Sequence, residues 1–252
     1  MQWRKDTKRW VLVVKNAGIV AKLAMPTSSQ LVSMNALLQN IARHFGLEMI
    51  PAWQLDDLAL ARHLRALFER HNVQQLIEVG TNSGAYGQFL RREVKYLDSI
   101  LSYEANAEAF KRLSERATAD PKWQCVLCEI SPESEGPESE GRKTDTAYNA
   151  LDSMADVTLP LAEGAGRMLK LDTQHLDFHV LDGATKVLNT LSCLQLEIAL
   201  PHSGNRASII ADSVGTLDRK GFILSGMFPV ESDDRLCANS FDCVFLNTAS
   251  VG

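Results

Sequence analysis

The chain has 252 residues, of which 45% are hydrophobic and 23% are charged, which is the composition of an ordinary globular protein with room for one large α/β core and a smaller appendage. Its formal net charge is −5 at pH 7, and this acidic balance disfavours a nucleic-acid-binding protein, whose surface is usually basic. The five cysteines, an odd number, favour free thiols in a reducing compartment, so we expect a cytoplasmic location.

Residues 1–55 are predicted to form a helical N-terminal extension. Between residues 28 and 46, apolar side chains recur at alternating spacings of three and four, which predicts a helix. This helix either packs on the main domain or forms a contact between subunits, which would make the protein a homo-oligomer. The apolar run Trp10–Val14 is interpreted as part of an arm, and the alternative is a helix that binds a membrane surface or a partner. The run is followed by Lys15 and is too short to span a membrane, so no transmembrane segment is expected.

Residues 56–252 are predicted to form one domain, organised around a strand, a glycine turn and a helix. Leu76–Val79 is a short apolar run typical of a buried strand, and Gly80–Gly84 is expected to be the turn that follows it. Apolar residues then repeat at helical spacing from Tyr86 to Val94. This arrangement brings backbone close to a ligand, because glycine has no Cβ that blocks the approach or forbids positive φ.

The nature of that ligand is indicated by the residues around the turn. The spacing of Gly80, Gly84 and Gly87 does not match the dinucleotide fingerprint G-x-G-x-x-G, and no lysine follows as a phosphate-binding loop requires. Glu78, just before the turn, would repel a pyrophosphate but attract a cationic ligand such as S-adenosylmethionine, which carries a sulfonium and an ammonium group. Glu104, at the end of the next strand, suits the ribose hydroxyls of an adenosine. These features favour a class I methyltransferase.

The rest of the domain alternates between helices and strands and ends in two strands. Further strands are expected at 100–104, 123–127, 168–172, 193–200, 222–230 and 241–246, and helices at 106–117, at 177–188 and after 205. The last two strands have no helix between them and are therefore expected to be antiparallel, whereas an all-parallel dehydrogenase sheet would keep alternating helices. We predict a Rossmann-like, seven-stranded α/β sheet with an antiparallel terminal strand.

Several blocks of the sequence occur in the order found in one known family. They are Leu76–Gly84, Ser102–Ala105, Leu169–Gln174, Val180–Ala184, Leu194–Glu197 and Phe241–Leu246. With these blocks the chain resembles the FkbM family of S-adenosylmethionine-dependent methyltransferases. The resemblance implies O-methylation of a hydroxyl group on a sugar, glycan or natural product, with S-adenosyl-L-methionine as the cofactor.

The residues expected to bind this cofactor follow the carboxyl ends of the strands, where ligands bind in open α/β sheets. Backbone of the turn is expected to surround the methionine part, Glu78 to lie near its ammonium group, and Glu104 to accept hydrogen bonds from the ribose. Residues after the third strand are expected to flank the adenine. The full set is Glu78, Gly80, Thr81, Asn82, Ser83, Gly84, Glu104, Ala105, Cys128, Glu129 and Asp172. Alternative roles are a salt bridge for Glu78, turn stabilisation for Asn82 and simple solvation for Glu129.

Catalysis at a hydroxyl acceptor benefits from a base that takes the leaving proton. The candidates are Asp172, His175, Glu197 and His202. Asp172 has the best position. The alternative roles are organisation of the cofactor or the loops for Asp172 and Glu197, and capping or lining of the cleft for the two histidines. His175 stands where the family typically has glycine. His175 and His179 are four residues apart, as metal ligands can be, but their spacing matches no known metal signature and no metal is predicted.

Two other functions stay open at this point. A NAD(P)-dependent oxidoreductase is disfavoured by the missing dinucleotide fingerprint and by the terminal strand pair. A non-enzymatic scaffold that keeps the fold is disfavoured by the intact acids and glycines of the turn. Residues 131–146 are polar, acidic and rich in Pro and Gly, and they form either a lid over a small-molecule or glycan substrate or an uninvolved surface loop.

Overall fold

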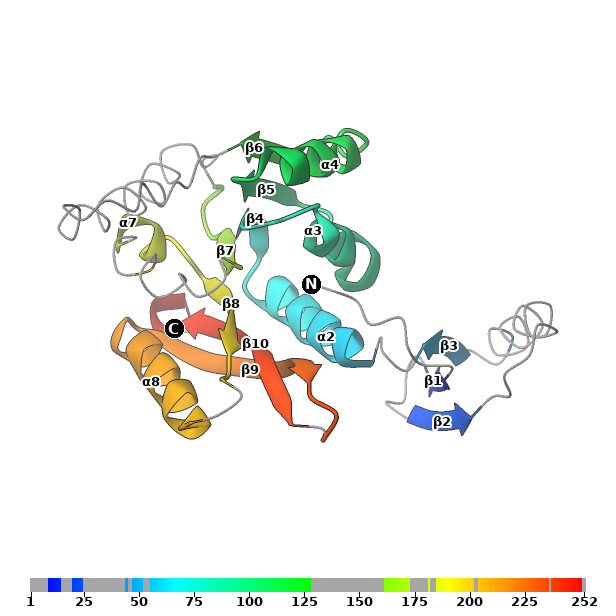
Figure 1. Cartoon of the computed structure of the whole chain (residues 1–252). Helices are drawn as coiled ribbons and strands as arrows, with labels where there is room; N and C mark the ends of the chain where they lie inside the picture. The colour runs from blue at the N-terminus through cyan, green and yellow to red at the C-terminus, as the bar shows by residue number, and fades with distance from the viewer. Residues whose placement is uncertain are drawn as a thin grey trace. The chain divides into compact units, whose positions relative to one another are not determined.

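A computed structural model describes residues 9–14, 20–24, 44, 47–51, 55–127, 161–172, 181, 185–201, 204–235 and 237–250 of the chain (Figure 1). The chain separates into two compact units, Met1–Leu60 and Ala61–Gly252. None of the helices in the described ranges is both long enough and apolar enough to cross a membrane.

The N-terminal unit contains an antiparallel sheet that the sequence did not predict. Its strands are β1 (Arg9–Val14), β2 (Val20–Ala24) and β3 (Leu47–Pro51), in the order β2-β1-β3. The prediction of a helical extension is therefore wrong for these segments. The physical reason is that β1 is rich in valine and also holds a tryptophan, residue types that favour strands once partner strands are available. The helix predicted over 28–46 lies outside the described residues except for His44, which is helical, so the subunit contact through it stays a prediction.

The main unit is built on the predicted mixed sheet. Its strands, in spatial order, are β6 (Trp123–Leu127), β5 (Ser99–Glu104), β4 (Val73–Val79), β7 (Gly166–Leu171), β8 (Cys193–Ala199), β10 (Ala238–Asn247) and β9 (Phe222–Ser232). The pairs from β6 to β8 are parallel, and β10 runs antiparallel to both of its neighbours. The seven strands and the antiparallel final strand confirm the predicted fold class.

Helices connect these strands, and asparagine side chains begin two of them. The described helices are α2 (Leu55–Arg70), α3 (Ala85–Phe89) continuing into η2 (Leu90–Val94), α4 (Ala107–Ala117), α7 (Thr185–Leu188) and α8 (Arg206–Arg219). The Asn106 side chain accepts a hydrogen bond from the Ala109 amide at 2.9 Å, and the Asn205 side chain accepts one from the Ser208 amide at 3.1 Å. Such caps satisfy backbone donors that the first helical turn leaves unpaired. Of the helix predicted over 177–188, the structure describes Leu181, which is helical, and α7 at the end.

The two faces of the sheet differ in chemistry. Because side chains alternate along a strand, Ile77 and Val79 of β4 join one buried apolar cluster with Leu217 of α8. Glu78 points to the opposite face, and α3 and α8 lie on opposite sides of the strands in Figure 1. The face of Glu78 also buries apolar side chains, among them Leu76, Ile100 and Met168, but near the carboxyl ends of the strands it carries polar groups.

Trp123 of β6 packs directly against the helix that follows the glycine turn. A Cβ added to Gly87 would lie 2.2 Å from Trp123 Cζ2, and one added to Gly84 would lie 2.8 Å from Leu113 Cδ1. Real Cβ atoms do not approach so closely, so both positions require glycine for packing. Gly84 also has a φ of +80°, which other residues rarely adopt.

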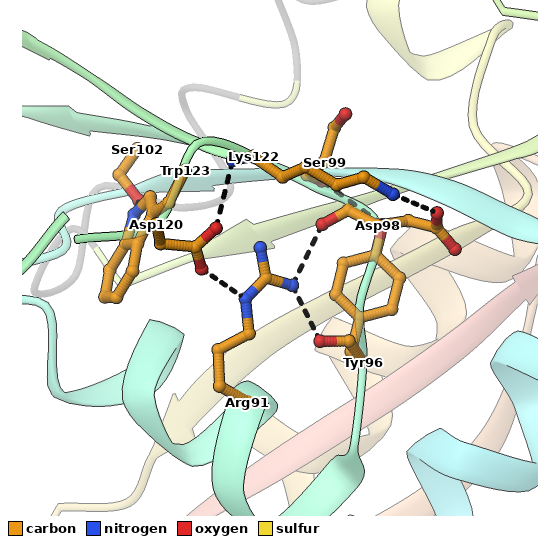
Figure 2. A network of polar contacts seen from close by, with 8 residues as sticks. All are labelled: Arg91, Tyr96, Asp98, Ser99, Ser102, Asp120, Lys122 and Trp123. Carbon is orange, nitrogen blue, oxygen red and sulfur yellow. Dashed lines mark hydrogen bonds and ion pairs between the residues drawn. The ribbon is translucent and has the colours of Figure 1, made fainter. Parts of the chain in front are cut away.

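A partly buried polar cluster fixes the far end of this helix (Figure 2). Arg91 donates from Nε to Asp120 Oδ2 at 2.6 Å and from Nη1 to the carbonyl oxygens of Tyr96 and Asp98 at 2.7 and 2.9 Å. One guanidinium therefore ties η2 to the segments that lead into β5 and β6. The helix is held at both ends, by Arg91 at one and by the glycine turn at the other.

We expect Arg91→Met to lower the free energy of unfolding by about 2–4 kcal/mol, because it leaves a partly buried carboxylate and two carbonyl groups without their donor. Chemical denaturation followed by circular dichroism measures this change. Arg112→Met is the matched control, because Arg112 is exposed and its ion pair with Glu108 is long, at 4.0 Å. The loss of free energy of unfolding in this variant should stay below about 0.5 kcal/mol. Equal losses in the two variants would contradict the role given to Arg91.

Candidate functional site

The glycine turn lies where β4 ends at the carboxyl edge of the sheet. Its backbone takes positive φ at Gly80 (79°), Asn82 (52°) and Gly84 (80°). The Gly80 amide donates to the Tyr103 carbonyl at 3.1 Å, and the Gly84 amide donates to the Thr81 carbonyl at 3.0 Å. Glycine and asparagine tolerate this conformation better than other residues do, so the sequence of the turn matches its geometry.

Glu104 connects the turn to the end of β5. Only 7% of it is exposed. Its Oε2 accepts a hydrogen bond from the Asn82 amide at 2.5 Å, and its Oε1 accepts one from the Asn106 amide at 2.8 Å. An ionised carboxylate can accept about four hydrogen bonds, so Glu104 keeps capacity for hydroxyl donors of a ligand while it holds the turn.

Glu78 is a fully buried acid beneath the turn. Ser102 Oγ donates to its Oε2 at 3.1 Å, and Trp123 Nε1 donates to the same Ser102 Oγ at 2.9 Å. Its second oxygen, Oε1, has no hydrogen-bond partner among the described residues. Burial raises the pKa of Glu78 to about 7, and the nearby Lys170 ammonium opposes that rise. A buried polar atom without a partner is costly, so this oxygen marks a place for a donor or a cation.

A row of polar side chains crosses the same face of the sheet from Glu78. Register places Lys170 of β7 beside Glu78, and Gln195 of β8 beside Lys170. Lys170 Nζ lies 3.0 Å from Asp172 Oδ2 and 4.8 Å from the centre of the Tyr86 ring. The ion pair of Lys170 is therefore with Asp172. Lys170 does not form the salt bridge that was the alternative role of Glu78.

The row continues from Tyr86 toward the antiparallel strands. Tyr86 donates from its hydroxyl to Gln195 Oε1 at 2.5 Å, and Gln195 Nε2 donates to Asp242 Oδ1 at 3.0 Å. The sequence reasoning missed Tyr86, Lys170, Gln195 and Asp242 as site residues. A signal was available for two of them, because Lys170 and Gln195 are polar residues flanked on both sides by leucines of buried strands.

Two of the four candidate bases, Asp172 and Glu197, lie within the described residues. Asp172 follows β7, and Glu197 lies on β8 directly opposite Asp242 of β10. Burial raises the pKa of Glu197 and of Asp242, and the charge of Asp172 adds to both effects. The carboxyl groups of Asp172, Glu197 and Asp242 therefore lie close enough to interact electrostatically. His175 and His202 lie outside the described residues.

The other predicted cofactor residues are placed as follows. Thr81 is buried, and its hydroxyl has no hydrogen-bond partner within the described part of the chain. Ser83 accepts hydrogen bonds from Arg116 Nη1 through its carbonyl (2.7 Å) and its hydroxyl (3.2 Å). Ala105 is exposed just after β5. Cys128 and Glu129 lie outside the described residues.

Metal ligation finds no support in the part of the chain that is described, where no group of three or more His, Cys, Asp or Glu side chains could hold an ion. His175, His179 and Asp177, the residues of the alternative metal site, lie outside the described ranges.

Comparisons with known proteins bear on the fold. No family model matches the sequence, and no curated protein matches it either. Among solved structures, Aeropyrum pernix fibrillarin with natively bound S-adenosyl-L-methionine is similar with a TM-score of 0.50 and 10% identity, over 80% of this chain and 79% of that chain. The main unit has the class I methyltransferase fold.

Two further structures with this fold are similar at lower scores. Methanococcus jannaschii fibrillarin, a pre-rRNA processing protein, has a TM-score of 0.49 and 9% identity over 70% of this chain and 67% of that chain. The methyltransferase domain of bacterial CtHen1 has a TM-score of 0.46 and 13% identity over 75% of this chain and 99% of that chain. As a general rule, ligands of open α/β sheets bind outside the carboxyl ends of the strands, and Glu78, Glu104 and the turn lie near that edge of the main sheet.

Proposed function

We propose that the protein is an S-adenosylmethionine-dependent methyltransferase. The observation that carries the proposal is Glu78, a fully buried acid whose Oε1 has no partner among the described residues and which lies beneath a glycine turn in a class I methyltransferase fold. An unpaired buried carboxyl oxygen is stabilised when a cation or an N–H donor reaches it. The ammonium group of S-adenosylmethionine supplies both.

The residues present fit this cofactor. Glu78 would hold the ammonium group, the backbone of Gly80–Gly84 would surround the methionine part, and Glu104 would accept from the ribose hydroxyls. The carboxyl groups around the turn outnumber the one cation, Lys170, that the described polar row contains, so the site favours a positively charged ligand. When bound, S-adenosylmethionine supplies a methyl group already activated by its sulfonium.

The chain's own contribution to the reaction is alignment and proton removal. Among the described candidate bases, Asp172 follows β7 and Glu197 lies on the neighbouring strand β8. Asp172 is bound to Lys170 at 3.0 Å, so its carboxylate is already engaged in an ion pair. Burial raises the pKa of Glu197 instead, which brings a carboxylate closer to the pKa that suits a general base near neutral pH. We therefore favour Glu197 over Asp172 as the base.

The acceptor is proposed from the resemblance of the sequence blocks to the FkbM family, which implies O-methylation of a sugar, glycan or natural-product hydroxyl. The acidic net charge of the chain, −5, supports a small-molecule or glycan acceptor over a nucleic acid, because phosphate-rich partners bind basic surfaces. Incubating the protein with methyl donor and candidate hydroxyl compounds tests this proposal. A product heavier by one CH2, because the methyl group replaces the hydroxyl proton, supports it. Transfer only to RNA, or to a nitrogen atom, would overturn the acceptor class.

Cofactor binding is tested separately by thermal shift with S-adenosylhomocysteine and with NAD. A ligand that binds only the native state raises the melting temperature. Stabilisation by S-adenosylhomocysteine alone supports the methyltransferase. Stabilisation by NAD alone would point to an oxidoreductase, and no response to either would point to a scaffold.

We expect Glu104→Ala to weaken S-adenosylhomocysteine binding by about 10–100-fold, which corresponds to about 1.5–3 kcal/mol for two charge-assisted hydrogen bonds. Isothermal titration calorimetry gives the dissociation constant. Glu115→Ala, which removes an exposed acid from α4, is the control and should bind like the unaltered protein. Unchanged affinity in Glu104→Ala would remove Glu104 from the cofactor site.

A further inference from the structure

Lys170 is a buried cation at the centre of the polar row. Its side chain is only 6% exposed, and its Nζ lies 3.0 Å from Asp172 Oδ2. On another side the ammonium lies over the ring of Tyr86, 4.8 Å from its centre. A buried ammonium is costly unless it is paired, and cation–π contact adds to the stabilisation. Two different groups therefore hold this side chain in place.

The group under Lys170 is itself fixed. Tyr86 is the second residue of α3, which starts directly after the glycine turn. Its hydroxyl donates to Gln195 on β8, and Gln195 in turn donates to Asp242 on β10. Through Tyr86, the position of Lys170 is linked both to the turn and to the strands on the other half of the sheet.

Lys170 also stands between two carboxyl groups that come from different strands. It is in register with Glu78 across the β4–β7 pair, and it forms an ion pair with Asp172 just beyond the end of β7. Glu78 belongs to the half of the site that follows β4 and β5, and Asp172 belongs to the half that follows β7 and β8.

We propose that Lys170 is a positioning residue that joins these two halves: it fixes the Asp172 carboxylate through the ion pair and opposes the charge of Glu78 across the neighbouring strand. The inference rests on the proposed function, because it takes Glu78 as the ligand of the cofactor ammonium. Its consequence is that cofactor affinity depends on a cation that does not itself bind the cofactor.

The charges around Glu78 predict how its pKa responds when a neighbouring charge is removed. The groups that face Glu78 from the elements packed against it are Lys170 and Asp172 from the β7 side, Ser102 and Glu104 of β5, Cys125 of β6 and Tyr86 of α3. Burial raises the pKa of Glu78 to about 7; the charge of Lys170 lowers it, and the charges of Asp172 and Glu104 raise it. Removing Lys170 and removing Asp172 should therefore move this pKa in opposite directions.

The experiment is the pH dependence of S-adenosylhomocysteine binding, measured by calorimetry between pH 5.5 and 8.5 in the full chain. In the unaltered protein, affinity should rise with pH and level off above about 7, because the ammonium binds ionised Glu78. Lys170→Met should move the midpoint up by about one pH unit, and Asp172→Asn should move it down. Lys170→Arg restores the charge and should return the midpoint toward its original value.

Arg167→Met is the matched control. Arg167 is a second buried cation of β7, 7% exposed, and it donates to Gln75 Oε1 at 2.6 Å, away from Glu78. Its loss should lower stability without moving the midpoint. If Lys170→Met does not fold, Lys170→Gln, which also removes the charge but keeps a polar side chain, takes its place in the comparison with Asp172→Asn.

The outcomes separate the two proposals. Shifts of opposite sign in Lys170→Met and Asp172→Asn support the positioning role. Equal midpoints in all variants, or shifts of the same sign, would overturn it while leaving the methyltransferase proposal standing. Failure of the unaltered protein to bind S-adenosylhomocysteine at any pH would overturn the proposed function itself.

Discussion

Replacing Glu78 with glutamine is expected to stabilise the unliganded protein at pH 8 and to weaken S-adenosylhomocysteine binding by about 10–100-fold. The stability effect follows from the pKa of Glu78, which burial raises from 4.5 to about 7. The folded state binds the proton more tightly than the unfolded state, so the protonated carboxyl favours folding at low pH. This contribution is lost as the pH rises from about 4.5 through about 7. Above that range the buried charge costs about 3 kcal/mol, and glutamine avoids this cost.

Thermal unfolding at pH 5 and at pH 8 measures the effect, and the advantage of Glu78→Gln should be larger at pH 8. Glu108→Gln is the control, because the Glu108 side chain is 86% exposed and its replacement should change neither quantity. A variant that is more stable and yet binds S-adenosylhomocysteine normally would show that Glu78 is a core acid with no part in binding. A variant that is less stable at pH 8 would show that the buried carboxylate is already compensated.

The second large effect is expected from Gly87→Ala. The new Cβ would lie 2.2 Å from Trp123 Cζ2 and 2.5 Å from Trp123 Cη2, so the indole or helix α3 must move. Overpacking of this kind costs about 1–3 kcal/mol, and we expect the upper end of that range because the obstacle is a rigid ring. Since Trp123 holds Ser102, which holds Glu78, cofactor affinity should fall as well.

Urea denaturation gives the change in free energy of unfolding. Gly215→Ala on α8 is the matched control: its Cβ would meet only Arg219 Nη1 at 3.6 Å, so alanine should stabilise the helix by about 0.5–1 kcal/mol. The double variant Gly87→Ala with Trp123→Phe should recover part of the loss, because the smaller ring makes room. Identical behaviour of the two glycine variants would contradict the packing of Trp123 against α3.

The main sheet could be predicted from the sequence because its strands are local apolar runs with clear boundaries. The antiparallel ending could be predicted because two such runs follow each other without a helix. The N-terminal sheet could not, because β1 pairs with β3 at Val14 and Leu47, a long-range pairing that local pattern does not encode. The N-terminal sheet thus depends on pairing between segments that are distant in the sequence, whereas the local pattern around β1 predicts only an arm.

The site could be predicted where local sequence pattern marks it and not where it depends on contacts between distant segments. Glu78, Glu104 and the turn stand out because acids and glycines interrupt apolar strands. The requirement for glycine at position 87 could not be foreseen, since it comes from Trp123 on β6, the second strand after the turn. Asp242 was equally hidden, because only the register of β8 with β10 brings it opposite Glu197.

The place of Trp123 also provides an optical probe. The sequence has four tryptophans, and the other three, Trp3, Trp10 and Trp53, precede residue 61, where the main unit begins. The Trp123 indole lies under the glycine turn and donates its N–H to Ser102. Ultraviolet emission from a chain with phenylalanine at the other three positions would come from this single fluorophore. Its wavelength and quenching would then report whether the turn tightens when a nucleoside arrives.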